Sequence, residues 1–488
     1  MSALRARVGT LLDDAVAAWA GAPGEDEVRA LRSRLDGPLR LALAGRVKAG
    51  KSTLLNALVG QELAPTDAGE CTRIVTWYEH GLTYRVELDP LDGPVRQVPF
   101  RRDGGALDID LGPLAPDQVR RLTVAWPSRA LEDLTLVDTP GLGSATVTTS
   151  QATVRFLTDA DGVDEVDAVC YLLRHVHADD VRFLEAFHDD DLAHATPVNA
   201  LGVLSRADEV GVARLDALDS ARRIADRWSQ DPRLRRLCQE VVPVAGLVAQ
   251  AGATLLEDEH RALAALATLP ADDLEALVLS AERFTAEDLG PAEVLPLVRR
   301  HLLDRLGLFG VRLAIDLLRR GEVDSATALA RALVDRSGIG ELRRLLTTRF
   351  AGRADVLTAR TALAGLDDLL QHRPPPAGAE ALAAEIEAIT AGAHDLAELR
   401  LLTALRTGAV AFGDADRQRA ERLLEETAPA ARLGLDDEVG DDAVRAAALD
   451  ELGRWQRRSE SPLATPEAAE AARTLARTCE GVLARVAG

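Results

Sequence analysis

Apolar residues follow two different periods along the chain, and the change falls near residue 250. Between residues 39 and 246, short apolar runs of strand length alternate with segments whose apolar residues recur at helical spacing. Beyond residue 247 almost every segment has helical spacing. The first pattern is typical of an α/β domain with a mostly parallel sheet, and the second is typical of an all-α region. The chain is therefore predicted to contain both.

Helices are also predicted in the N-terminal segment, before the α/β domain. One apolar stripe at helical spacing is formed by Leu4, Val8, Leu11, Leu12, Val16 and Trp19. A second short helix follows the glycines at residues 21–24. The stripe requires a cover, and long helices of the C-terminal half are the natural one. We therefore expect N-terminal helices in residues 1–37, an α/β domain in residues 38–250, and a helical bundle in residues 251–488 that both chain ends build.

Strand and turn signals subdivide the two larger parts. A strand-rich insert at residues 84–126 predicts additional sheet at one edge of the α/β domain. Three prolines at residues 374–376 mark a corner in the helical half, because proline cannot continue a helix. Residues 379–405 and 465–486 are predicted as helices, the second with Thr465 as its N-cap and proline at its first position.

A glycine-rich loop lies between the first apolar strand, residues 39–44, and a helix-like segment. Its sequence matches G-x-x-x-x-G-K-S, the pattern of a phosphate-binding loop in its strand-loop-helix context. The lysine is expected to reach the β/γ-phosphate oxygens, and the serine hydroxyl to bind Mg²⁺. The candidate nucleotide contacts are Gly45, Arg46, Val47, Lys48, Ala49, Gly50, Lys51, Ser52 and Thr53.

A second phosphate-side motif follows an apolar run at residues 134–137. It reads D-x-x-G, from Asp138 to Gly141. The aspartate would hold the Mg²⁺ shell, and the glycine N–H would meet the γ-phosphate. Two such motifs in this order predict a nucleotide hydrolase. Thr72, about twenty residues after the phosphate-loop serine, is our choice to complete the Mg²⁺ shell, with Thr66 as the competing choice.

The base is predicted to be guanine. The strand at residues 201–204 leads into Ser205, Arg206 and Asp208, a degenerate form of the N/T-K-x-D motif. A carboxylate at Asp208 would accept hydrogen bonds from guanine N1 and the exocyclic amine, which disfavours ATP. The Arg206 stem and guanidinium plane can lie over the base. A later strand ends at Ala245 and Gly246, which fit a loop that closes over guanine through backbone N–H groups.

These segments together resemble the bacterial dynamin-like proteins. The resembling stretches are GRVKAGKSTLLNALVG, LAPTDAGECTRIVTW, VDTPG, SRADEVG with VVPVAGL, and LGLFGVRLAIDLL with SGIGELRRLL. The resemblance implies a large GTPase that uses Mg²⁺, with helices from both chain ends in a neck and trunk bundle beside the nucleotide domain. It also implies nucleotide-dependent self-association coupled to membrane remodelling, and a partner of the same family that carries the membrane contact.

The phosphate loop departs from the wider dynamin pattern at two positions. Val47 and Lys48 stand where eukaryotic dynamins have glutamine and serine, which help place a monovalent cation and the attacking water. Our hypothesis is that the Lys48 ammonium replaces that cation near the β/γ bridge. The alternative is a solvent-facing lysine that contacts an acidic partner surface. The candidate catalytic residues are Lys48, Lys51, Ser52 and Thr72.

Composition narrows the classes of binding partner that we expect for this chain. The formal charge of -21 argues against nucleic acid and against a basic face that binds anionic lipid. We therefore expect a weak or indirect membrane contact. Residues 1–21 lack the apolar core of a signal peptide, so we expect a cytoplasmic protein, with the inner face of the plasma membrane as an optional peripheral site. The four scattered cysteines are interpreted as small buried thiols.

Two functions follow from these observations. The first is a GTP hydrolase that forms a homodimer through its GTPase domain, or a hetero-assembly with a dynamin-like paralogue. The second is an adaptor that holds GTP, hydrolyses it slowly and serves an active paralogue. Val47 and the degenerate base motif keep the second function open.

Overall fold

The computed structural model of the protein describes most of the 488-residue chain. The described residues are 2–65, 74–103, 106–140, 166–174, 197–286, 291, 293–374, 378–436 and 438–486.

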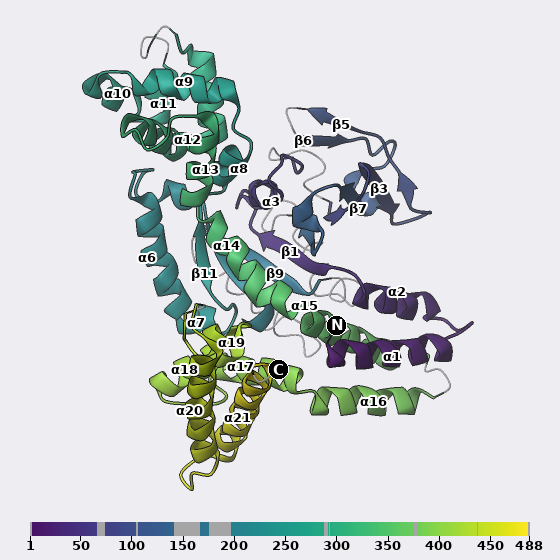
Figure 1. The fold of residues 1–488 in the computed structure, drawn as a ribbon. Coiled ribbons are helices and arrows are strands. Elements are labelled where there is room, and N and C mark those ends of the chain that lie inside the picture. The colour runs from purple at the N-terminus through teal and green to yellow at the C-terminus, as the bar shows by residue number, and fades with distance from the viewer. Residues whose placement is uncertain are drawn as a thin grey trace.

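Among these residues, nine strands form one central sheet in the order β11-β10-β9-β1-β8-β2-β7-β3-β4. Figure 1 shows that helices lie around this sheet. The strands from β11 to β8 run parallel, whereas β2 lies antiparallel to β8, and β3 to β7. The bounds are β1 Leu39–Gly45, β2 Thr76–His80, β3 Arg85–Pro90, β4 Arg96–Gln97, β7 Val119–Trp126, β8 Leu134–Asp138, β9 Ala168–Leu173, β10 Ala200–Ser205 and β11 Val241–Val244. Strands β5 Phe100–Asp103 and β6 Ala106–Ile109 pair separately. The predicted parallel centre and the additional sheet at one edge are confirmed.

The central strands are apolar on both faces because both faces are covered. In β1, Leu41 and Leu43 belong to one apolar core and Ala42 and Ala44 to another, and all four side chains are buried. Parallel strands that are buried on both sides have such continuous apolar runs. This explains why the run before the glycine-rich loop could be recognised as a strand.

Helices surround the sheet and make up most of the second half. Among the described residues, those of the first half are α1 Ala3–Ala18, α2 Glu25–Leu35, α3 Lys51–Val59, α6 Ala217–Gln230 and α7 Pro232–Arg235. Those that follow β11 are α8 Gly246–Ala253, α9 Glu257–Ala267, α10 Ala271–Leu277, α11 Ala281–Thr285, α12 Pro296–Arg319, α13 Ala326–Arg336 and α14 Ile339–Leu345. The last group is α15 Ala354–His372, α16 Ala379–Gly392, α17 His394–Thr407, α18 Asp414–Glu425, α19 Pro429–Arg432, α20 Asp441–Ser459 and α21 Pro466–Val486.

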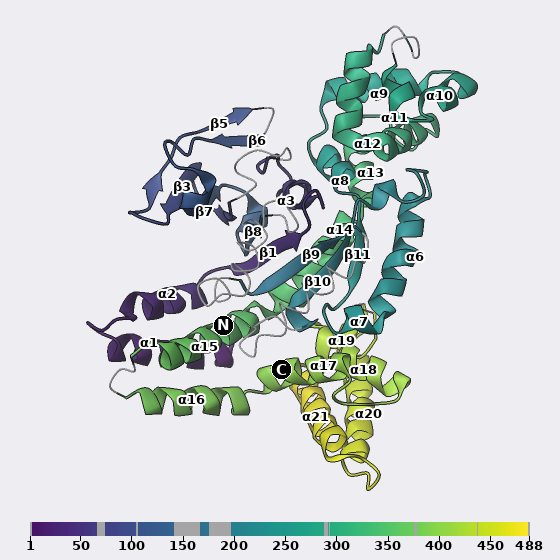
Figure 2. The same cartoon turned by 180° about the vertical axis from the view of Figure 1, so that it is seen from behind.

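The cover of the N-terminal stripe comes from the middle of the helical half. Helices α1 and α2 share one apolar core with α15 and α16, and the four lie side by side in both views (Figures 1 and 2). The final hairpin, α20 and α21, packs instead with α17 and α18. Thr465 caps α21 as predicted, since the Ala468 N–H donates to its Oγ1 at 3.2 Å. The single helix expected at residues 379–405 is divided into α16 and α17 by extended backbone at Ala393.

Helices α8 to α13 form a unit at the carboxyl end of the parallel strands. Their apolar core is continuous with residues of β10 and α6. Residues 320–337 contain α13, which packs on α8. The contact is close, because a Cβ at Gly252 of α8 would lie 2.9 Å from Ala330 O. Phe309 in α12 is buried. Gly246 and Leu247 of α8 line the cavity that is described below, so the unit lies beside the candidate nucleotide site.

A buried carboxylate joins the helical bundle to the sheet. Asp167, just before β9, accepts hydrogen bonds from the Arg34 guanidinium at 2.9 Å, the Arg40 N–H at 2.9 Å and the Thr361 hydroxyl at 3.0 Å. These donors belong to α2, β1 and α15. Three donors, of which one is the Arg34 cation, compensate the loss of hydration that burial imposes on the carboxylate.

In the part of the chain that the structure describes, no helix is both long and apolar enough to cross a membrane. Cys170, Cys238 and Cys479 are buried free thiols, as interpreted from the sequence, and Cys71 lies outside the described residues.

Candidate nucleotide site

The glycine-rich loop connects β1 to α3 through unusual backbone angles. Gly45 has φ +149°, and a Cβ there would lie 2.8 Å from Leu172 O, so that only glycine fits beside β9. Gly50 has φ +94° at the start of α3. Lys48 has φ +63° and is exposed, as are Arg46 and Val47. The loop is thus curled, with three exposed side chains on its outer side.

Lys51 lies inside this curl. Its ammonium donates to Gly45 O at 3.2 Å and Arg46 O at 3.4 Å, and the residue is 9% exposed. Burial lowers the pKa of Lys51, and the nearby Asp138 carboxylate opposes that effect. A desolvated cation held by loop carbonyls is well placed to bind an anion that enters the loop.

Ser52 and Asp138 form the second part of the phosphate side. The Ser52 hydroxyl donates to Asp138 Oδ2 at 3.0 Å. Burial raises the pKa of Asp138, while Lys51 and the Ser52 hydrogen bond lower it. Asp138 Oδ1 is shielded from solvent and has no hydrogen-bond partner among the described residues.

This donor set fits Mg²⁺. A hydroxyl and a carboxylate are hard oxygen ligands of the kind that Mg²⁺ binds together with substrate phosphates. The shielded Oδ1 gives the carboxylate an unused acceptor beside the phosphate loop. The remaining phosphate-side candidates, Thr72 with its competitor Thr66, and Gly141, lie outside the described residues.

A cavity of about 220 Å³ extends from the phosphate loop to the predicted base motif. It brings together residues of α3, of the loop after β10 and of the start of α8. Its lining is Ala49, Gly50, Thr53, Leu54, Leu172, Val203, Ser205, Arg206, Asp208, Glu209, Val244, Gly246 and Leu247. Residues more than 190 positions apart in the sequence thus meet around one space.

Asp208 is the ionisable group that burial perturbs most in this cavity. It is 6% exposed, and burial raises its pKa to about 6. A Cβ at Gly307 of α12 would lie 3.6 Å from Asp208 Oδ2. The buried carboxylate therefore lies against α12, in a setting where paired N–H donors of a ligand would be bound strongly.

Arg206 borders the cavity, but its guanidinium is bonded elsewhere. Its Nη1 donates to Glu209 Oε1 at 2.6 Å, and Arg174 donates to Glu209 Oε2 at 2.6 Å. We expected the guanidinium plane to lie over the base, and here Glu209 holds it. Glu209 was missed at the sequence level, although its position three residues after Arg206 is a signal for such a pair.

Two residues after β11 were candidates for contact with the base, and one of them lines the cavity. Gly246 lines the cavity, and a Cβ there would lie 3.4 Å from Thr53 Cγ2. Ala245 does not line it, because its N–H donates to Ser337 O at 2.9 Å. The turn at Ser337 and Gly338 approaches β11 closely. Gly338 has φ +83°, and a Cβ there would overlap Pro243 O.

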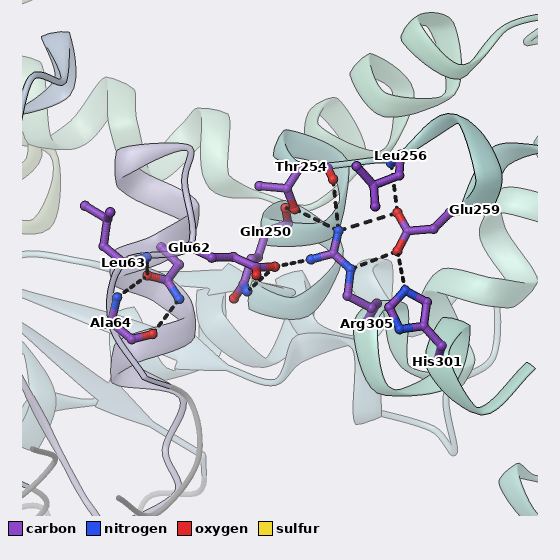
Figure 3. Close-up of polar contacts among 10 residues, drawn as sticks. Glu62, Leu63, Ala64, Gln250, Thr254, Leu256, Glu259, His301 and Arg305 are labelled. Atoms are coloured by element: carbon purple, nitrogen blue, oxygen red, sulfur yellow. Dashed lines mark hydrogen bonds and ion pairs between the residues drawn. The ribbon is translucent and has the colours of Figure 1, made fainter. Parts of the chain in front are cut away.

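One side-chain amide, that of Asn56, holds the end of the phosphate-loop helix. Asn56 Oδ1 accepts from the N–H groups of Leu63 and Ala64 at 2.9 Å and 2.8 Å, and its Nδ2 donates to Ala64 O at 2.9 Å (Figure 3). These bonds hold the chain that leaves α3 against the helix itself.

Ionic contacts continue from that chain into the α8–α13 unit. Arg305 of α12 pairs with Glu62 and donates to Glu259 Oε1 at 2.9 Å and Thr254 O at 2.9 Å (Figure 3). Burial opposes ionisation of Glu259, but hydrogen bonds from Arg305 and the Leu256 N–H outweigh burial and lower its pKa. Sequence reasoning missed this network, because its members are up to 243 positions apart.

Comparisons with known proteins show which proteins this chain resembles. The sequence model of the Dynamin family matches residues 41–93. The isoniazid-induced protein IniC of Mycobacterium tuberculosis is 41% identical over 487 residues, which cover 98% of each chain. A bacterial dynamin-like protein of Nostoc punctiforme is 32% identical over 130 residues, 24% of this chain and 19% of that one.

A solved structure described as an oligomerised bacterial dynamin pair aligns at a TM-score of 0.31 with 13% identity. The alignment covers 99% of this chain and 74% of that chain. A likeness at this TM-score is too weak to bear on function.

Proposed function

Since the chain belongs to the dynamin family, and within it to the IniC type of bacterial dynamin-like protein, we propose that it binds GTP and hydrolyses it with Mg²⁺. The observation that carries the proposal is the cavity that joins Gly50 and Thr53 of the phosphate loop to Asp208 and Gly246. It supports a ligand with phosphates at one end and a guanine base at the other.

Each group has a defined task in this proposal. Lys51 leaves the loop carbonyls to bind β/γ-phosphate oxygens, and Asp208 accepts from the guanine N–H groups. Ser52 and Asp138, together with Thr72, would hold Mg²⁺, which when bound neutralises charge on the phosphate oxygens. The buried setting of Lys51 and Asp138 strengthens their electrostatic action on the phosphates.

We assign Lys48 a part in the chemical step. Its exposed side chain, on the curled loop, would supply fixed positive charge where charge develops between the β- and γ-phosphates. Lys48→Ala should then lower kcat on the order of 100-fold in potassium-free buffer. A parental rate for this variant without potassium would support the alternative, a lysine that contacts an acidic partner surface.

We further propose that GTP drives dimerisation through the GTPase domain, or assembly with a dynamin-like paralogue, and that this association serves membrane remodelling. The net charge of -21 supports weak or indirect membrane contact from the cytoplasmic side, with the paralogue binding lipid.

The test is GTP turnover measured against protein concentration, with and without liposomes, and with ATP as competitor. Lys51→Ala is the control, because it removes the cation inside the phosphate loop. Specific activity that rises with concentration and is lost in Lys51→Ala would support a hydrolase that dimerisation activates.

The hydrogen bond from Arg206 to Glu209 engages the guanidinium that would otherwise lie over the base, and it favours a second candidate function. In that case the chain is a slowly hydrolysing adaptor of an active paralogue. Turnover near zero at every concentration, together with measurable GTP binding, would support the adaptor and exclude the hydrolase.

A further inference from the structure

The loop that follows Asp208 in the chain, residues 211–213, has a backbone conformation that its residues disfavour. Gly211, Val212 and Ala213 have consecutive φ angles of +64°, +63° and +55°. Glycine adopts such angles freely, whereas alanine and especially β-branched valine do not. The Val212 side chain is 82% exposed, so its own packing does not compensate for the strain. Another contact must hold this loop.

That contact is Arg312 of α12. Its Nη1 donates to Val212 O at 3.1 Å and to Ala213 O at 2.6 Å. The other guanidinium nitrogens donate to Val278 O, at 3.0 Å and 2.7 Å, and to Leu279 O at 3.1 Å. One rigid, always charged fork thus ties the strained loop to the end of α10.

The same helix touches the base cavity directly. Five residues before Arg312, Gly307 interrupts α12 with φ +66° and ψ +170°. A Cβ at Gly307 would lie 3.6 Å from both Asp208 Oδ2 and Leu247 Cδ1. Helix α12 therefore lies against the Asp208 carboxylate at one point and holds the loop that follows Asp208 at another.

The short segment between Asp208 and residues 211–213 couples the position of the carboxylate to the conformation of the loop. Asp208 lies in the helical turn Ala207–Glu209. The Val210 N–H donates to Ala207 O at 3.4 Å, and the strained loop begins at the next residue. If the loop relaxed toward negative φ angles, the direction of the chain at Val210 would change, and the Asp208 carboxylate would turn with it.

We propose that Arg312 is a positioning residue for base recognition, which holds residues 211–213 so that Asp208 faces the guanine site. This inference rests on the proposed binding of guanine nucleotides and deepens it. Because the contact lies on the base side, loss of Arg312 should weaken GDP and GTP binding equally. Relaxation of one left-handed residue corresponds to a loss of about tenfold in affinity.

The experiment measures the Kd of GDP and of GTP for the full chain by fluorescence, with thermal unfolding as a check on folding. The variants are Arg312→Ala, Arg312→Lys and the matched control Arg319→Ala. Arg319 is on the same helix and donates to the carbonyl of Leu269 at 3.2 Å, outside the cavity lining. We expect an equal loss for both nucleotides in Arg312→Ala, a smaller loss in Arg312→Lys and none in the control.

A second substitution separates positioning from general stability. Val212→Gly accepts the left-handed conformation at no steric cost, and little packing is lost at so exposed a site. In the Arg312→Ala background it should recover part of the lost GDP affinity. Parental GDP affinity in a folded Arg312→Ala or Arg312→Lys variant would overturn the inference, as would a loss that Val212→Gly does not reduce. A parental chain that binds neither nucleotide would instead refute the proposed function itself.

Discussion

Guanine nucleotide binding should weaken in mild acid, because Asp208 must be ionised to accept the base N–H groups. Asp208 is 6% exposed, and burial raises its pKa from 3.8 to about 6. With that pKa, ~90% of molecules hold the carboxylate form at pH 7 and ~10% at pH 5. The affinity for GDP should therefore fall about ninefold between these pH values through this group alone.

The raised pKa of Asp208 also makes the free energy of unfolding depend on pH. The folded chain binds the Asp208 proton more tightly than the unfolded chain, so this group favours folding most below pH 3.8. That contribution, about 3 kcal/mol for a shift of roughly two pKa units, is lost as the pH rises to about 6. A ligand that donates to the carboxylate reverses part of this cost, so GDP should stabilise the chain more at pH 7 than at pH 5.

Titration calorimetry of GDP between pH 5 and 7.5 provides the assay. The parental chain is compared with Asp208→Asn, and the ratio of the two affinities cancels the titration of the nucleotide phosphate, whose second pKa is also near ~6. Measurements at pH 6 in buffers of different ionisation enthalpy should show proton release on binding by the parental chain beyond that of the variant. If the affinity ratio is the same at pH 5 and pH 7, the assignment of Asp208 to the base is refuted.

Three substitutions test the contacts that hold the site together. Gly45→Ala should destabilise the chain by about 2–4 kcal/mol, because a Cβ 2.8 Å from Leu172 O forces a shift at a position with φ +149°. Asp167→Ala leaves a buried guanidinium without its carboxylate, so urea unfolding should show a loss of about 3–5 kcal/mol. Arg305→Gln leaves Glu259, which is 4% exposed, without its main cation, and a loss of about 3 kcal/mol is expected in the same assay.

A surface pair is the matched control for the last two substitutions. Arg29 and Glu25 form an exposed pair within α2, and Arg29→Ala should cost about 0.5 kcal/mol or less. Losses for Asp167→Ala and Arg305→Gln no larger than this control would show that neither buried carboxylate depends on its cation.

Local pattern was enough to identify the sheet centre, and it located the two motifs that we propose for the phosphate side of the site. The strands around Leu41, Leu136 and Leu201 are predominantly apolar, and motifs directly follow them. Each motif is short, so the hydrogen bond from Ser52 to Asp138 joins two segments that local signals had already located. Because a strand end and its following loop are consecutive in the chain, their geometry depends little on distant residues.

The folded chain alone shows which distant groups meet around the proposed site. The Ala245 N–H is occupied by Ser337 O, Glu209 holds Arg206, and Arg312 supports a loop 100 positions away. No periodicity in the sequence encodes these pairs, because each depends on how whole helices pack on the sheet. Likewise, the apolar stripe of α1 required a cover, but several helices carried a matching face. Long-range packing selected α15 and α16, since a hydrophobic stripe specifies burial without specifying its partner.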